Sequence, residues 1–279
     1  MNHVSVCDSF FPLRSVGRQP LADVDPVRPP SATILSTPGL TKEFRGFTAV
    51  DHVDLTVQEG TVHALVGPNG AGKTTLFHLL TGFLRPTSGK ILYRGVDITG
   101  RQPEDIVHLG IARSFQITSL FDKLTALEHL ELALCSPTGL GFRFWQSQKR
   151  LGRFRQHAME LLDQVGMADE ADREVGEFAY GKKRAVELAL ALALDPRLLL
   201  LDEPTAGMGV EDVDRTIALV SRISEGRTIV FVDHNMHVVG SLADRVTVLQ
   251  QGTILVEGSY DEVRTDEKVI TAYLGEAHV

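Results

Sequence analysis

The fold is decided by the segment Gly67-Pro68-Asn69-Gly70-Ala71-Gly72-Lys73-Thr74-Thr75, in which two glycines five positions apart are followed by Lys and Thr. This is the phosphate-loop pattern, and it lies between an apolar, strand-like run at 61–66 and a helical pattern that starts at Leu76. In such a loop the backbone N–H groups and the helix N-terminus face the phosphates, Lys73 adds a positive charge, and the Thr74 hydroxyl holds Mg²⁺. The sequence therefore predicts a nucleoside triphosphate site.

An acidic pair follows a second apolar run, because the leucines at 198–201 are succeeded by Asp202 and Glu203. We expect Asp202 to reach Mg²⁺ through water. Glu203, one peptide further on, points to the other side and is placed to polarise the attacking water as general base. Acidic residues also end strands as helix caps, but the glycine loop upstream favours the catalytic interpretation.

Two further residues extend this set. His234 follows the apolar run 228–232, where a sensor of the γ-phosphate would lie, and a structural histidine is the alternative. Gln116 stands in the segment Ala112-Arg113-Ser114-Phe115-Gln116 and is a candidate contact to the metal or the attacking water. The candidate catalytic residues are Glu203, His234 and Gln116, and the candidate magnesium ligands are Thr74, Gln116 and Asp202.

Hydrophobic patterning predicts an α/β fold. The runs 198–201 and 228–232 do not alternate, which is typical of strands buried on both faces and indicates a parallel core sheet wrapped by helices. Residues 51–57 and 61–66 form the pattern of two strands joined by a turn, which would open a small sheet, and 245–257 form that of a hairpin. The expected helices cover 124–134, 157–165, 183–194 and 268–274.

The domain limits follow from composition and pattern. Residues 1–38 hold six of the twelve prolines and neither a basic nor an apolar leader region, which predicts a flexible tail ahead of one domain at 39–279. Helical patterns dominate from about 85 to 180, with no strong strand after 91–93, so we expect a helical insertion there.

Composition excludes several classes of protein. A formal net charge of -8 argues against a protein that wraps nucleic acid, since phosphate neutralisation needs clustered Lys and Arg. The two cysteines, Cys7 and Cys135, suggest a reducing compartment rather than a disulfide framework. The longest apolar stretch, 185–201, is interrupted by charged residues and Pro196, so the chain is not expected to cross a bilayer.

Five elements in this order make the chain resemble an ATP-binding-cassette (ABC) ATPase subunit. They are the phosphate loop, Gln116, the segment Phe178-Ala179-Tyr180-Gly181-Lys182 at the place of the family's signature, Asp202-Glu203 and His234. Segments 112–120, 201–208 and 269–275 resemble the branched-chain amino acid importer group in particular. The resemblance implies a P-loop NTPase fold with a parallel core sheet, an antiparallel β-subdomain and an inserted helical subdomain.

The resemblance also implies a function. The chain would bind ATP and Mg²⁺ and hydrolyse ATP to drive uptake of branched-chain amino acids, with urea or short amides as the alternative solutes. Its partners would be a second ABC ATPase subunit, two membrane permease subunits and, indirectly, an external solute-binding protein, but no nucleic acid. It would lie on the cytoplasmic face of the inner or plasma membrane, attached peripherally through the permease subunits.

Two binding surfaces come from the same resemblance. Phe44 stands where the family places an aromatic ring against adenine, and a core phenylalanine is the alternative. Ala179, Tyr180, Gly181 and Lys182 would contact the ATP held by the partner subunit, because two such domains close head to tail. Only Gly181 keeps the usual Leu-Ser-Gly-Gly-Gln, and Ala179 lacks the serine hydroxyl. Gly209 likewise replaces the usual Asp or Asn of the next loop.

Two alternative classes of protein remain, and one stretch has two interpretations. A soluble ABC protein of translation or DNA repair usually carries two cassettes or a long coiled coil, and neither is present. A GTPase or small nucleotide kinase is disfavoured because an Asn-Lys-x-Asp motif is missing. The aromatic and basic stretch from Phe142-Arg143-Phe144-Trp145 to Arg155 could rest against a membrane surface or a permease, or form a solvated helix.

Overall fold

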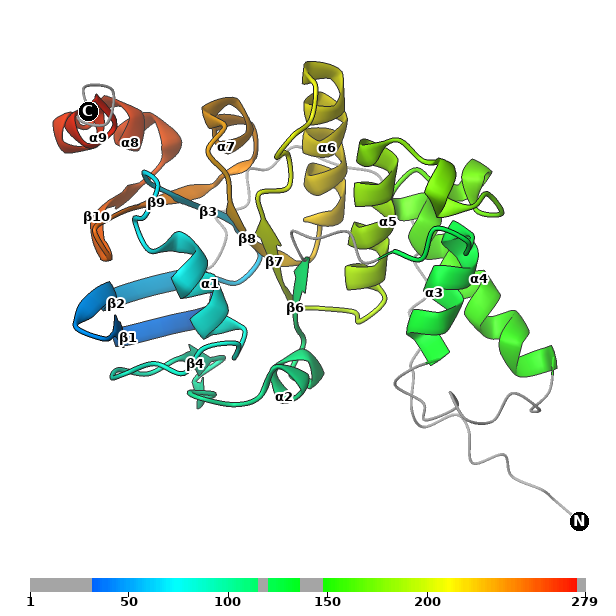
Figure 1. Cartoon of the computed structure of the whole chain (residues 1–279), viewed down its shortest axis with the longest axis horizontal. Helices are drawn as coiled ribbons and strands as arrows, with labels where there is room; N and C mark the ends of the chain where they lie inside the picture. The colour runs from blue at the N-terminus through cyan, green and yellow to red at the C-terminus, as the bar shows by residue number, and fades with distance from the viewer. Residues whose placement is uncertain (1–31, 115–119, 136–147, 275–279) are drawn as a thin grey trace, which may run out of the picture. The chain divides into compact units, whose positions relative to one another are not determined.

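The computed structural model describes residues 32–114, 120–135 and 148–274. Two sheets organise this part of the chain (Figure 1). The smaller has the order β2-β1-β4-β5, from Phe47–Gln58, Thr33–Phe44, Leu92–Tyr93 and Val96–Asp97. The larger has the order β10-β9-β3-β8-β7-β6, from Thr253–Gly258, Arg245–Gln250, Val62–Val66, Thr228–Val232, Leu198–Asp202 and Ile111–Ser114.

The larger sheet is parallel from β9 to β6, and β10 adds one antiparallel edge strand. The expected hairpin at 245–257 is therefore present, and it extends the core sheet. Seven described helices lie between strands: α1 Lys73–Leu80, α2 Pro103–His108, α3 Ala126–Cys135, α4 Gln148–Gln164, α5 Tyr180–Leu192, α6 Val210–Ile223 and α7 Met236–Leu242. Two more, α8 Tyr260–Thr265 and α9 Glu267–Leu274, follow β10. None of the described helices is both long and apolar enough to cross a membrane.

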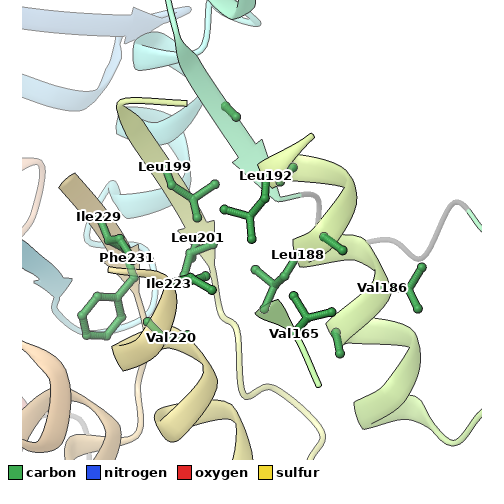
Figure 2. Packing of buried hydrophobic residues seen from close by; sticks show 14 of the residues in the cluster. Val165, Val186, Leu188, Leu192, Leu199, Leu201, Val220, Ile223, Ile229 and Phe231 are labelled. Atoms are coloured by element: carbon green, nitrogen blue, oxygen red, sulfur yellow. The ribbon is translucent and has the colours of Figure 1, made fainter. Parts of the chain in front are cut away.

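Successive residues of the central strands are buried on opposite faces of the sheet. Leu199 and Leu201 of β7 belong to a cluster with Leu188 of α5 and Val220 of α6 (Figure 2). The intervening leucines of β7 join a second cluster, which contains Phe77 of α1 and the apolar side of the smaller sheet. Burial on both faces explains why these strands show no alternation in the sequence.

The structure corrects the expected hairpin of 51–57 and 61–66, because β2 and β3 belong to different sheets. All five residues of β3 are buried, whereas β2 alternates between buried and more accessible positions. A strand buried on both faces suits the centre of a parallel sheet, which is where β3 lies, between β8 and β9.

Two expected boundaries also change. The first strand starts at Thr33, inside the segment assigned to the tail, and its register is irregular between Thr37 and Leu40, around Pro38. The span 85–180 is not wholly a helical insertion, because β6 within it pairs with β7 as an edge of the core sheet. Helices α3, α4 and α5 then pack against one another and form the helical part.

Candidate nucleotide site

The glycine loop joins β3 to α1 and is shaped by close backbone contacts. Gly67 has φ 147° and Gly72 has φ 101°, a region that residues with side chains rarely adopt. A Cβ at Gly67 would clash with the Leu249 carbonyl oxygen, and one at Gly72 with that of Ala49. Glycine is therefore required at both positions by packing as well as by conformation.

The turn between β9 and β10 is hydrogen-bonded to the glycine loop. The Gly252 N–H donates to the Ala71 carbonyl at 3.1 Å, and the Gly252 carbonyl accepts the Asp51 N–H at 2.8 Å. One residue thus links the glycine loop to β2. The hairpin pattern at 245–257 predicts this turn but not this contact, because the partners of Gly252 lie about 180–200 positions away in the chain.

Lys73 begins α1 and lies across the loop. Its Nζ donates to the Gly67 carbonyl at 2.6 Å and to the Pro68 carbonyl at 2.8 Å. The first bond of the helix runs from the Leu76 N–H to the Gly72 carbonyl, at 2.9 Å. The N–H groups ahead of Leu76 are those that a helix leaves for an anion, so the ammonium group and the helix N-terminus concentrate positive potential at the loop.

Asp202 ends β7 as a buried residue that is held at its carboxylate and at its backbone carbonyl oxygen. Arg113 of β6 places its Nη2 2.5 Å from Oδ2, and its guanidinium also lies 5.8 Å from the ring centroid of Phe77 in α1. Arg184 of α5 donates from Nη2 to the Asp202 carbonyl oxygen at 3.1 Å. Asp202 is therefore fixed beside α1, at the carboxyl end of the parallel strands.

Glu203 has an unusual backbone conformation. Its φ is 46°, in the left-handed region, which costs about 1–2 kcal/mol for a residue with a side chain. Its N–H donates to the Val232 carbonyl of the neighbouring strand at 2.9 Å. The chain thus turns sharply between Asp202 and Glu203. Their separate roles as metal ligand and base stay a prediction.

The loop after β8 is anchored to the loop after β7 by a buried carboxylate. Asp233 accepts the Thr205 hydroxyl at 2.7 Å and the Asn235 N–H at 2.9 Å. His234 is exposed between these anchored residues. Because Val232 pairs with Asp202 in the sheet, His234 lies at the same strand edge as the acidic pair, which suits a sensor better than a buried structural histidine.

The segment at the place of the signature begins α5. Ala179 is its N-cap, and its carbonyl accepts the N–H groups of Lys182 and Lys183 at 3.0 and 3.1 Å. The Lys182 ammonium lies 2.6 Å from Glu170 Oε1, and this contact lowers the pKa of Glu170. The charge of Lys182 is therefore balanced inside its own chain.

Phe44 is 40% exposed at the end of the β1–β2 hairpin, with the Lys42 ammonium 4.9 Å from its ring centroid. The core interpretation of Phe44 is wrong. In the hairpin Phe44 pairs with Phe47. Ala49 follows two residues later, and its carbonyl oxygen lies close to Gly72, so the hairpin lies near the glycine loop. An adenine contact stays a prediction. Gln116 and the stretch 142–145 lie outside the described residues.

Sequence reasoning did not identify Arg113 or Arg184 as site residues. A signal for each existed, because Arg113 interrupts the apolar strand and Arg184 is followed by mostly apolar helix positions. A buried arginine requires paired acceptors. Glu187, one acceptor of Arg184, is three residues away, but the other acceptors lie 18 and 70 residues from Arg184 and 89 residues from Arg113. Most of the pairing is therefore visible only in the fold.

A glycine loop between a buried strand and a helix, with a buried carboxylate at the end of another strand of the same parallel sheet, defines a P-loop nucleoside triphosphatase. Comparison with known families agrees with this class. The pattern of the ABC transporter family matches residues 50–206, and that of the branched-chain amino acid ATP-binding cassette transporters matches residues 253–279. The chain belongs to the ABC transporter family.

Individual relatives point the same way. The chain is 38% identical over 256 residues to the high-affinity branched-chain amino acid transport ATP-binding protein BraF of Pseudomonas aeruginosa, covering 88% of this chain and 100% of BraF. It is similar to the ADP conformation of MJ1267, an ATP-binding cassette of an ABC transporter, with a TM-score of 0.77, 29% identity and coverage of 87% and 99%.

A third similar protein is the cassette MJ0796, whose solved structure is dimeric in a post-hydrolysis state with ADP and Pi. Its TM-score is 0.67 at 25% identity, with coverage of 81% of this chain and 99% of that one. The comparisons confirm the ABC ATPase fold, the resemblance to the branched-chain group, and the expectation of a nucleotide-binding ATPase coupled to transport.

Proposed function

We propose that this chain hydrolyses MgATP to energise uptake of branched-chain amino acids by a membrane importer. The observation that carries the proposal is the similarity to BraF, which spans the whole of that protein, together with the branched-chain family pattern at residues 253–279. Urea or short amides remain the second class of solute. The transported solute is selected by other subunits, so the site geometry supports the ATPase and the relatives support the solute.

In this proposal the nucleotide phosphates lie on the glycine loop from Gly67 to Thr75, balanced by Lys73, with Phe44 against the adenine. Asp202 suits a hydrated Mg²⁺, because hard cations prefer carboxylate oxygens and retain several waters. Arg113 engages only Oδ2 of this carboxylate. Thr74 and Gln116 complete the proposed metal ligands, and the bound ion would supply charge neutralisation at the phosphates.

The remaining residues act on the water and the phosphate. Glu203 accepts a proton from the attacking water, and its left-handed backbone conformation turns the chain between the metal ligand and the base. His234, exposed at the same strand edge, senses the γ-phosphate, and Gln116 orients the water from the helical side. These roles together describe phosphoryl transfer by positioning and electrostatic stabilisation.

The partner subunits follow from the family. A second cassette would close on this one, with Ala179, Tyr180, Gly181 and Lys182 facing the partner's nucleotide, as the dimeric MJ0796 supports. Two permease subunits would hold both cassettes at the cytoplasmic face of the membrane, and an external binding protein would deliver the solute.

The test is transport in a defined system. The chain would be expressed with the permease and cassette proteins encoded beside it, and the complex placed in vesicles with MgATP and the external binding protein. We expect uptake of labelled leucine that is lost in Lys73→Ala, because that variant lacks the charge that balances the phosphates. Uptake of urea without leucine would support the second solute class. ATP affinity unchanged in Lys73→Ala would contradict the phosphate-loop assignment.

A further inference from the structure

Arg184 is a buried cation that joins three elements. It lies in the second turn of α5 and is 3% exposed. Its Nη1 donates to Glu187 Oε2 at 2.9 Å, and its Nη2 donates to the Ser114 hydroxyl of β6 at 3.3 Å and to the Asp202 carbonyl of β7 at 3.1 Å. A buried guanidinium is tolerated only where it has such acceptors, so Arg184 links α5 to the ends of β6 and β7.

The peptide group that Arg184 contacts is the one between the proposed metal ligand and the proposed base. Its carbonyl oxygen, on Asp202, accepts from Arg184, and its N–H, on Glu203, donates to the Val232 carbonyl at 2.9 Å. Both polar ends of this peptide are therefore anchored. The orientation of a peptide plane sets the φ of the following residue, and Glu203 has the strained value of 46°. Arg184 thus helps to hold the peptide orientation on which the backbone conformation of Glu203 depends.

The same helix carries the segment at the place of the signature. Ala179 caps α5, Gly181 and Lys182 lie in its first turn, and Arg184 follows them in a continuous helix. A helix moves as a unit, because each turn is bonded to the next. Any rotation of the helical part that moves Gly181 toward a partner's nucleotide therefore also moves the guanidinium that holds the Asp202–Glu203 peptide.

We propose that Arg184 is a positioning residue that couples the orientation of the signature helix to the Asp202–Glu203 peptide, and so to the aim of the general base. The inference rests on the proposed roles of Asp202 and Glu203. It predicts that loss of Arg184 impairs catalysis through Glu203 while leaving nucleotide capture by the glycine loop intact. Arg113, which holds the Asp202 carboxylate independently, would keep the metal ligand close to its position.

A purely structural role is the rival explanation. Burial raises the pKa of Glu187, and the adjacent Arg184 opposes that shift, so Arg184 would then serve to keep a buried carboxylate charged. Glu187→Gln separates the two roles, because it removes this charge pair and leaves the contact with the Asp202 carbonyl. The informative set is therefore Arg184→Met, Arg184→Lys and Glu187→Gln, in the complete transporter.

Steady-state ATPase kinetics give the first readout. For Arg184→Met we expect kcat to fall about ten- to a hundredfold, the range for a lost hydrogen bond to a charged group, with KM for ATP changed less than about threefold. Arg184→Lys should be intermediate, since one ammonium group cannot reach all three acceptors of the guanidinium fork. Glu187→Gln should stay within about threefold of wild type. A fall in kcat for Glu187→Gln equal to that for Arg184→Met would overturn the proposal.

A double-variant cycle gives the second readout. If Arg184 acts through Glu203, Arg184→Met should not lower the residual rate of Glu203→Gln further, because residues acting as a unit are non-additive. If Arg184→Met lowered the residual rate of Glu203→Gln by the same factor as it lowers the wild-type rate, the coupling would be refuted. Arg184→Lys replaces Arg184→Met in the cycle if the latter does not assemble into the complex.

Binding of a fluorescent ATP analogue, with Mg²⁺ and with EDTA, gives a third readout that does not depend on turnover. We expect Arg184→Met to bind like wild type under both conditions, whereas equal weakening under both would indicate a structural role. Asp202→Asn serves as the reference, because in this variant Mg²⁺ should no longer increase the affinity for the ATP analogue. If wild type and Asp202→Asn respond to Mg²⁺ alike, the proposed metal site fails, independently of Arg184.

Discussion

The Arg113 guanidinium and the Asp202 carboxylate form an ion pair in which Nη2 lies 2.5 Å from Oδ2, with side chains that are 8% and 4% exposed. The pair joins the edge strand β6 to the strand that carries the proposed metal ligand. A buried pair of this kind depends on both partners, because removing one leaves a charge without water or a counter-ion.

Arg113→Met should therefore reduce the free energy of unfolding by about 3–5 kcal/mol. The cause is the unpaired Asp202 carboxylate, since methionine keeps most of the volume beside Phe77 but none of the charge. Urea denaturation of the purified chain measures the effect, and Arg113→Lys is the matched control that keeps the charge. A loss below about 1 kcal/mol for Arg113→Met would mean that Asp202 finds another partner.

The parts predicted correctly from the sequence are those with a local pattern. The strands at 198–202 and 228–232 and the helix from Lys73 were predictable, because unbroken apolar runs and the glycine loop identify them within a few residues. The strand β6 was missed because it has only four residues, two of them Arg113 and Ser114, whose polar groups are satisfied by residues far along the chain.

The start of β1 and the place of β3 were missed for other reasons. Pro38 breaks the alternation of β1, and the register of β1 against β2 shifts around it. Strand β3 follows β2 closely in sequence, but its pairing partners are β8 and β9, more than 150 residues later. The candidate site residues that belong to local motifs can be predicted from the sequence, whereas Arg113, Arg184 and Gly252 depend on such distant pairings.

Glu203→Gln should leave ATP binding intact, stop hydrolysis, and trap the closed dimer in ATP, because the amide cannot accept the proton of the attacking water. The substitution keeps the side-chain size and the left-handed backbone at this position. Size-exclusion chromatography with ATP and a phosphate-release assay measure the two effects. Undiminished phosphate release would require a different base.

His63 should make the fold acid-sensitive. It is buried in β3 with Nε2 2.8 Å from the Thr247 hydroxyl, and burial lowers its pKa to about 4, with Glu257 opposing and Arg245 reinforcing the shift. Between about pH 6.5 and 4 the unfolded chain therefore binds a proton that the folded chain does not. The free energy of unfolding should fall as pH falls through this window, by on the order of 3 kcal/mol at its lower end.

Urea denaturation at several pH values between 7 and 4.5 measures this dependence, with His63→Gln as the control, because glutamine cannot titrate and can still bond to Thr247. The wild-type chain should lose more stability on acidification than His63→Gln does. Parallel pH profiles for the two proteins would show that His63 does not govern the acid sensitivity.

The last prediction concerns Ala179 and the partner cassette. Ala179 caps α5 without a side-chain hydrogen bond and has no hydroxyl to offer a nucleotide, whereas the glycine loop, Asp202 and Glu203 of the same chain are complete. A hydrogen bond to a charged group contributes about 1.5–3 kcal/mol, so a homodimer would lose roughly ten- to a hundredfold in ATP-driven closure at each of its two sites.

A heterodimer with a cassette that carries the serine would suffer that loss at one site only. The positive charge of Lys182 offsets little of it, because Glu170 already holds that ammonium at 2.6 Å. ATPase rates of the chain alone, of Ala179→Ser, and of the chain mixed with the cassette encoded beside it measure the asymmetry. We expect Ala179→Ser to raise the rate of the chain alone and the mixture to exceed both unmixed proteins. A wild-type homodimer whose ATPase rate is already high and is not raised by Ala179→Ser would contradict the prediction, since the missing hydroxyl would then have no energetic consequence.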